Sequence, residues 1–150
     1  MPDARFRDAG DMPLRLMAMD AEDLKVISAL VQDAVLNVGD MRWDAKGRRL
    51  DLLLNRFRWE NGTREAERVR AILTVECALG VASDGVDRSG DTVLSLLDLA
   101  FEAGEAPGGA LVLRLAGDGA IRVSVEALEV RLADVTRPYA APSGRVPNHD

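Results

Sequence analysis

The spacing of apolar residues changes along the chain, from a helical period near the N-terminus to a period of two after it. Residues 14–18 alternate between apolar and polar types and predict a short strand. Asp20 suits the N-cap of a helix, and apolar residues at helical spacing predict that this helix runs from about residue 21 to residue 38. Gly39 would end it as a C-terminal cap. The pattern therefore predicts one amphipathic helix close to the N-terminus.

From residue 40 onward, the alternation is typical of strands. The predicted strands cover residues 41–43, 48–59, 68–81, 93–101, 111–115 and 121–125. Turn sequences at Lys46-Gly47 and at Gly117-Asp118-Gly119 join neighbouring strands and predict two hairpins. Residues 127–135 fit either a strand or a helix, and we favour the strand.

One helix with six to eight short strands predicts an α+β fold. The N-terminal amphipathic helix should pack on a mostly antiparallel, curled sheet or partial β-barrel. Residues 13–135 are predicted to form this single domain. Residues 1–12 are predicted to be a flexible leader, and the proline-containing residues 136–150 a mobile tail.

Composition narrows the class of protein. The chain has 150 residues, of which 47% are hydrophobic and 29% charged, as is usual for a soluble globular domain. Its one cysteine, Cys77, excludes an intramolecular disulfide and zinc sites built on several cysteines. Cys77 alternates with Val75, Leu79 and Val81, which predicts a buried structural thiol. The chain shows no signal peptide and no long apolar run, so we expect a cytoplasmic protein without membrane contact.

Charge is distributed unevenly along the chain. The net charge of −6 argues against a protein that coats nucleic acids through a general positive charge. Residues 42–70, however, hold nine basic and five acidic residues. This segment could therefore contact an anion or a nucleic acid, although we do not favour that interpretation.

Few residues in the chain suit catalysis. The one histidine, His149, lies in the predicted tail, so histidine-based triads and histidine metal sites are not expected. Asp51, Glu76 and Asp98 lie within predicted strands and are the carboxylates that could serve acid–base or metal chemistry. We predict no catalytic residue, no metal site and no cofactor, while an enzyme that uses carboxylates or a metal remains an alternative.

The segment Asn55-Arg56-Phe57-Arg58-Trp59-Glu60 combines aromatic residues with arginines. A regular strand would place Arg56 and Arg58 on one face and the aromatic residues on the other. Such a pattern can stack bases and grip phosphates, and tryptophan and arginine are also frequent in protein interfaces. The interpretation we favour is an ordinary strand with aromatics in the core and arginines in solvent. The candidate binding residues are Trp43, Asn55, Arg56, Arg58, Trp59, Arg68 and Arg70.

Three segments, residues 14–43, 50–60 and 108–135, together carry a family resemblance. Within them, Gln32-Asp33-Ala34-Val35 and the segment 55–60 are the most characteristic. These segments resemble a family of short, mainly alphaproteobacterial proteins, domain of unknown function 2948. The resemblance implies a bacterial cytoplasmic protein and supplies no activity, cofactor or catalytic residue.

Three functions follow from the sequence. The main prediction is a non-enzymatic binding or adaptor protein that acts through protein–protein contacts, including self-association as a homodimer. It depends on the lack of a catalytic set and on residues 50–54 and 93–97, which are apolar on both faces of their strands. The alternatives are an RNA- or anion-binding module that uses the segment 42–70, and a carboxylate- or metal-dependent enzyme.

Overall fold

The computed structural model describes residues 13–58, 67–135 and 139–140. Its elements are β1 (Arg15–Ala18), α2 (Ala21–Leu30), β2 (Val35–Asn37), the short 3-10 helix η1 (Val38–Asp40), β3 (Met41–Asp44), β4 (Arg49–Phe57), β5 (Glu67–Val75), β6 (Ala78–Asp84), β7 (Val93–Ala103), β8 (Gly109–Leu115), β9 (Ala120–Val125), β10 (Val130–Asp134) and β11 (Tyr139–Ala140). The predicted α+β class with a mostly antiparallel sheet is confirmed. The predicted number of strands is wrong, because the described residues form eleven.

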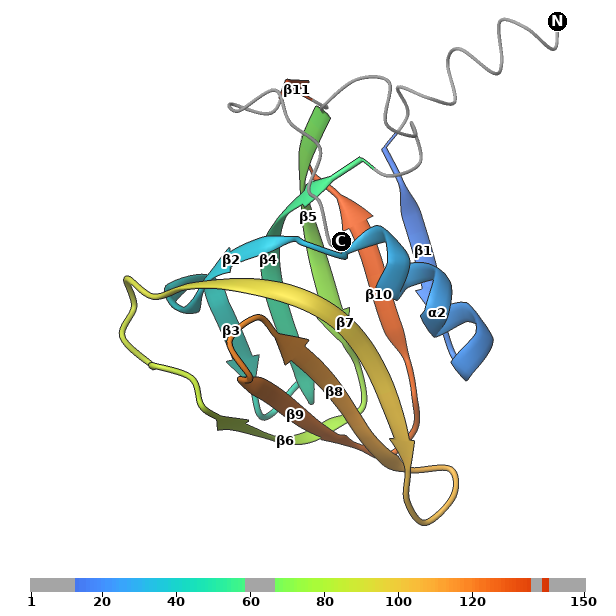
Figure 1. The fold of residues 1–150 in the computed structure, drawn as a ribbon. Coiled ribbons are helices and arrows are strands. Elements are labelled where there is room, and N and C mark those ends of the chain that lie inside the picture. The colour runs from blue at the N-terminus through green and yellow to red at the C-terminus, as the bar shows by residue number, and fades with distance from the viewer. Residues whose placement is uncertain (1–12, 59–66, 136–138, 141–150) are drawn as a thin grey trace, which may run out of the picture.

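The strands form one sheet in the order β1-β10-β5-β4-β2-β7-β8-β9-β6, with β3 added on β4 and β11 on β5. Figure 1 shows that this sheet folds back on itself, so that β10, β5 and β4 form one layer and β6 to β9 another. The short strand β2 joins the layers, because it pairs with both β4 and β7. The helix α2 packs against β1 and β7 at the open side between the layers.

A single cluster of buried apolar side chains fills the space between the two layers. Strands β4 and β5 supply Leu52 and Leu73, and strand β9 supplies Ile121 from the opposite layer. The helix adds Leu24 and Ile27, which are its buried residues. Burial of each such side chain contributes about 1.5–3 kcal/mol, so this interior is the main source of stability.

The start of the helix was predicted correctly, but its end was not. Asp20 Oδ1 accepts a hydrogen bond from Asp23 N at 2.8 Å, as expected of an N-cap. The helix ends at Leu30, and Asp33 has a left-handed φ of 64°. Ala34 O then accepts a hydrogen bond from Leu96 N in β7. Pairing with this distant strand outweighs the helical spacing of the apolar residues, so residues 35–37 form β2.

The strand predicted at residues 68–81 is broken at Cys77, where φ is 55°. It becomes β5 and β6, which lie in different layers. The break turns the side chains that follow it, so that 54% of Leu79 is exposed and Cys77 is only half-buried. The prediction that Cys77 shares a buried face with Leu79 and Val81 is therefore wrong. The strand favoured within residues 127–135 is confirmed as β10.

The predicted leader, residues 1–12, and most of the predicted tail lie outside the described residues. Within the tail, Tyr139 and Ala140 form β11, which pairs with Arg68 and Glu67 of β5. None of the described helices has both the length and the apolar content needed to cross a membrane.

Candidate functional site

The arginines of the 55–60 segment do not lie on the surface. The side chains of Leu50, Leu52 and Leu54 alternate toward the core along β4, and Arg56 is next in this series. Arg56 is fully buried and Arg58 is 2% exposed. The prediction that these arginines face solvent is wrong, because strand parity places Arg56 on the core side. The burial predicted for the aromatic residues is confirmed for Phe57, whereas Trp59 lies outside the described residues.

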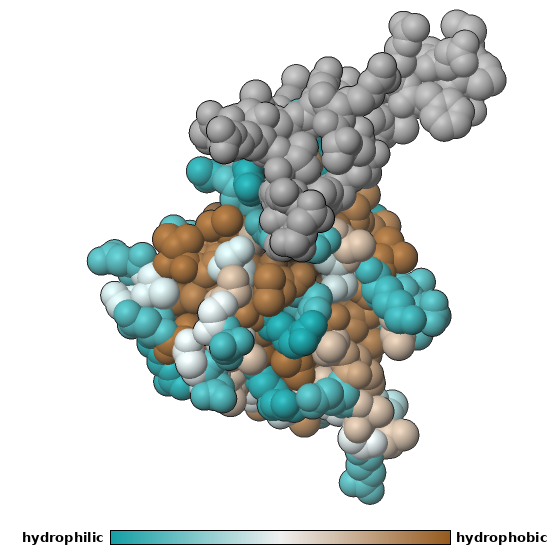
Figure 2. Space-filling view, in the orientation of Figure 1, coloured by the Kyte–Doolittle hydropathy of each residue, from teal (hydrophilic) through white to brown (hydrophobic). Residues whose placement is uncertain are grey.

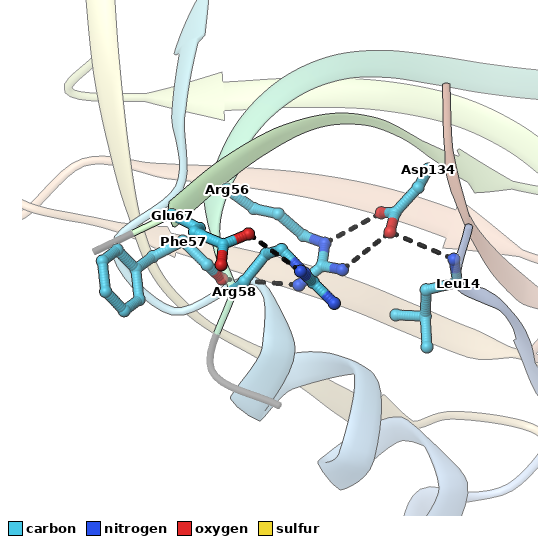
Figure 3. Close-up of polar contacts among 6 residues, drawn as sticks. All are labelled: Leu14, Arg56, Phe57, Arg58, Glu67 and Asp134. Carbon is cyan, nitrogen blue, oxygen red and sulfur yellow. Dashed lines mark hydrogen bonds and ion pairs between the residues drawn. The ribbon is translucent and has the colours of Figure 1, made fainter. Parts of the chain in front are cut away.

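Arg56 is held inside the protein by Asp134 of β10. Arg56 Nε donates to Asp134 Oδ1 at 3.0 Å, and Arg56 Nη2 donates to Asp134 Oδ2 at 2.9 Å (Figure 3). Asp134 Oδ2 also accepts a hydrogen bond from Leu14 N at 3.1 Å. The two-point ion pair therefore connects β4 with β10 and with the residue before β1. The ion pair offsets the free-energy cost of burying the Arg56 charge. Arg56 therefore serves as a structural contact.

Arg58 has a similar internal role beside Arg56. Its Nη1 donates to Glu67 Oε2 at 2.9 Å (Figure 3). Its backbone N–H donates to Glu67 O at 3.0 Å. The Arg58 side chain is 3% exposed and the Glu67 side chain 20%. These contacts fasten the end of β4 to the start of β5. A partner in solution therefore has little access to either arginine in this conformation.

Three other candidates gather on the outer face of the sheet, away from the core. Asn55 lies opposite Arg70 in the pairing of β4 with β5. Arg68 Nη1 donates to Asn55 O at 3.3 Å. Trp43, which is 41% exposed, lies on β3 and pairs with the core residue Leu50 of β4. It therefore shares the inner face of the sheet with Leu50 and does not belong to the outer face. The structure thus joins Asn55, Arg68 and Arg70 and separates them from Trp43, Arg56 and Arg58.

A cavity of about 620 Å³ opens on this outer face, over β3, β4, β5 and β10. Its lining consists of Asp40, Arg42, Arg49, Asp51, Leu53, Ile72, Thr74, Glu76, Arg131, Ala133 and Val135. The strand register explains the grouping. Arg131 lies opposite Thr74, Thr74 opposite Asp51, and Asp51 opposite Arg42, so that these four form one row across the sheet. Side chains directly opposite each other share a face, and here it is the solvent face.

Charges of both signs surround an apolar floor in this cavity. Thr74 Oγ1 donates to Asp51 Oδ1 at 2.6 Å, and Arg49 Nε lies 3.6 Å from Asp51 Oδ2. These contacts fix the Asp51 carboxylate. Within the described part of the chain, the side chains of Arg42 and Glu76 form neither a hydrogen bond nor an ion pair. Among the described residues, the lining carboxylate of Asp40 has no such contact either, so one cationic and two anionic groups are available to a ligand.

A smaller cavity of about 200 Å³ continues this surface toward β2 and β7. It shares Asp40 and Leu53 with the larger one and adds Asn55, Arg70 and Val93, among others. Val93 is 62% exposed. Figure 2 looks onto the side of α2 and β7, where apolar surface interrupts the polar one over the region of β2 and β7. The outer face therefore ends beside exposed apolar side chains.

Two of the three carboxylates selected from the sequence meet in the larger cavity. Asp51 and Glu76 both line it, whereas Asp98 lies in the other layer and pairs with Arg114. The hydrogen bond from Arg114 holds the pKa of Asp98 below its usual value, despite partial burial that acts in the opposite direction. Asp98 is thus a partner in a surface ion pair, remote from the cavity.

Most residues that line the cavity were not selected from the sequence. Arg42 and Arg49 were noted only as part of the basic segment, and Thr74 and Arg131 only through the strands that contain them. Parity within each strand would have indicated which side chains share a face, but their grouping required the register between strands. In the described residues, no three His, Cys, Asp or Glu side chains gather in a way that could hold a metal ion.

Comparison with known proteins places the chain in a family without assigning it an activity. No curated protein and no solved structure matches the sequence. A family model described as "Protein of unknown function (DUF2948)" matches residues 14–149, which is most of the chain. The chain therefore belongs to the DUF2948 family.

Proposed function

We propose that the protein is a non-enzymatic binding protein that recognises a partner protein through the outer face of β3, β4, β5 and β10. The observation that carries this proposal is the cavity of about 620 Å³, in which arginines and carboxylates surround an apolar floor. Arg42 and Arg131 flank the fixed Thr74–Asp51 pair in one row. Arginine is enriched among the residues that dominate binding energy, and a polar rim around an apolar centre is typical of protein interfaces.

The charge balance of the cavity favours a protein partner over a nucleic acid. Three carboxylates and three arginines line it, so its formal charge is zero. A surface that binds the phosphate backbone needs an excess of positive charge, since neutralisation of phosphates supplies most of the affinity. Arg56 and Arg58, which the nucleic-acid alternative would use, form internal ion pairs instead.

An enzyme that uses carboxylates is a second candidate, supported by the presence of Asp51 and Glu76 in one cavity. Asp51 is held by Thr74 and lies near Arg49. This arrangement fixes a carboxylate in one orientation, as recognition of a partner's cation also requires. A substrate screen with Asp51→Asn and Glu76→Gln would test this candidate. If the two carboxylates act as acid and base, either change alone should cause a loss of turnover.

The test of the main proposal compares two charge-reversed proteins. In Arg42→Glu/Arg131→Glu the outer face is changed, while Arg114→Glu/Arg122→Glu changes two arginines on the other layer and serves as the matched control. Proteins captured from native extract after nuclease treatment would be identified, produced in pure form and titrated by calorimetry. We expect the affinity for a true partner to fall at least about tenfold with the outer-face variant, a loss of about 1.4 kcal/mol, and to be kept with the control.

Equal binding by the two variants would contradict the proposal, provided that both fold as the natural chain does. Capture that disappears with nuclease and weakens steeply with added salt would support the nucleic-acid alternative instead. Light scattering on the pure chain tests a third outcome, which is self-association. A dimer that dissociates only in the outer-face variant would identify the partner as a second copy.

A further inference from the structure

The sheet does not close completely, and a second cavity lies where it remains open. Among the described residues, β3 pairs only with β4, and β6 pairs only with β9. We call the gap between β3 and β6 the seam. Near one end of the seam, Ala78 N donates to Arg48 O at 2.9 Å. Near the other end, Gly39 and Gly90 lie so close that a Cβ on Gly39 would be 3.0 Å from Gly90 O. Between these contacts a cavity of about 220 Å³ remains.

The walls of the seam cavity are apolar and come from distant segments. Val38 and Met41 lie on one side, Val81 and Val86 on the other, and the core residue Ile121, which is 1% exposed, also contributes. Because Val81 is 36% exposed, the mouth of the cavity is accessible to a solute. The cavity therefore connects solvent to the edge of the core.

The polar groups of the seam cavity are confined to one place. Arg88 is its charged lining residue, and Arg88 Nε donates to Ser83 Oγ at 3.3 Å. No carboxylate belongs to the described lining. A guanidinium can bind a carboxylate through two nitrogens. The hydrogen bond to Ser83 occupies Nε, and no other described group pairs with the terminal nitrogens of this exposed arginine, so they are available to a ligand. In contrast to the outer face, the seam thus combines an apolar slot with a positive charge alone.

We propose that the seam cavity binds a small amphipathic carboxylate, whose apolar chain occupies the slot and whose carboxylate contacts Arg88. Charge complementarity selects the anion, because the lining supplies one cation and no acid. The volume of about 220 Å³ lies below the range of about 300–1,000 Å³ usual for drug-sized ligands, which indicates a short chain. This site is separate from the outer face, so the proposal stands independently of the partner protein.

The test uses octanoate as the probe, with the full chain, by calorimetry and by amide NMR. We expect octanoate to shift the signals of Val81, Ser83 and Val86. Across shorter carboxylates, each added methylene should tighten binding about fourfold, until the slot is full and the gain stops. Octan-1-ol should bind more weakly than octanoate, and octylammonium more weakly still.

Two variants separate the apolar slot from the charge. Val81→Trp should fill the slot and weaken octanoate and octan-1-ol alike. Arg88→Gln should reduce the affinity for octanoate to about that for octan-1-ol and leave octan-1-ol unchanged. Arg114→Gln, on the other layer, is the matched control and should change neither. If Val81→Trp fails to fold, Arg88→Gln still decides, because Arg88 is exposed.

The proposal is overturned by any of three results. The first is no binding of octanoate at millimolar concentration, and the second is equal affinity for octanoate and octylammonium. The third is a set of NMR shifts located on the outer face of β4 and β5, away from the seam. The Arg42→Glu/Arg131→Glu variant should lose the partner protein and keep its affinity for octanoate. Failure of one proposal can therefore be distinguished from failure of the other.

Discussion

Removal of the carboxylate that neutralises Arg56 should be among the most damaging single changes in this protein. The side chains of Arg56 and Asp134 are 0% and 4% exposed, and two hydrogen bonds join them. Asp134→Ala removes this carboxylate and both of its hydrogen bonds from a buried guanidinium. Loss of one partner of a buried pair typically costs about 3–5 kcal/mol. This is a large share of the roughly 5–15 kcal/mol that stabilises a typical domain.

The structure also predicts how far a second change restores stability. In Arg56→Met/Asp134→Leu both charges are gone, and apolar side chains of similar size occupy the interior. Such replacements are often neutral or stabilising. The losses that remain include the hydrogen bond that Leu14 N donates to Asp134, worth about 1–3 kcal/mol where its donor stays unsatisfied, and the one that Arg56 donates to Phe57 O. The double variant should therefore be more stable than Asp134→Ala.

Urea unfolding followed by circular dichroism measures these differences. With a slope of about 2 kcal/mol per molar urea, Asp134→Ala should lower the unfolding midpoint by about 1.5–2.5 M. Arg15→Met, which removes an exposed arginine from β1, is the control and should leave the midpoint nearly unchanged. A loss below about 1 kcal/mol for Asp134→Ala would refute the reasoning. Purely additive effects of Arg56→Met and Asp134→Leu would refute it as well, since residues in direct contact should couple.

Arg114 holds the Asp98 pKa below its ordinary 3.8, so the ionised carboxylate stabilises the fold at neutral pH. Asp98→Asn should therefore be less stable than the natural chain at neutral pH. In acid unfolding experiments, this difference should vanish as the pH falls through the lowered pKa. Burial, aided by nearby carboxylates, raises the Cys77 pKa above 9.0, so iodoacetamide should modify it more slowly than a free cysteine peptide at about pH 8, by mass spectrometry. Gly109→Ala places Cβ 2.3 Å from a β7 carbonyl oxygen and should cost about 1–3 kcal/mol in thermal unfolding, whereas Gly80→Ala, with open space, should not.

Elements whose contacts are local could be predicted from the sequence. The cap at Asp20 involves an amide three residues away, and the Lys46-Gly47 turn joins strands that follow each other directly. The end of the helix depended instead on a distant strand, because Leu96 forms hydrogen bonds with the backbone of Asp33 and Ala34. Apolar spacing over residues 21–38 contains no information about that pairing. The error therefore reflects a tertiary contact that overrides a local preference.

The orientation of Arg56 was predictable in part. Alternation along β4 already places Arg56 on the same face as Leu52 and Leu54, so parity alone indicates the core. The charge of arginine suggested solvent, and the two arguments conflicted. What resolves the conflict is Asp134, which is 78 residues away in the sequence. No pattern within one strand could have identified that partner.

Burial of these arginines changes what the basic segment 42–70 implies. Its positive excess along the sequence does not become an equal excess at the surface, because Asp134, which lies outside the segment, neutralises Arg56 in the interior. Arg58 is also buried, in an ion pair with Glu67. Arg48 pairs with Glu126, the residue that follows β9, and Arg49 lies beside Asp51. The cavity lining on the outer face is balanced in charge. A cluster of basic residues in a sequence supports nucleic-acid binding only if the fold leaves the charges exposed and unpaired. Here Arg48, Arg49, Arg56 and Arg58 each lie beside a carboxylate, which favours recognition of a protein surface instead.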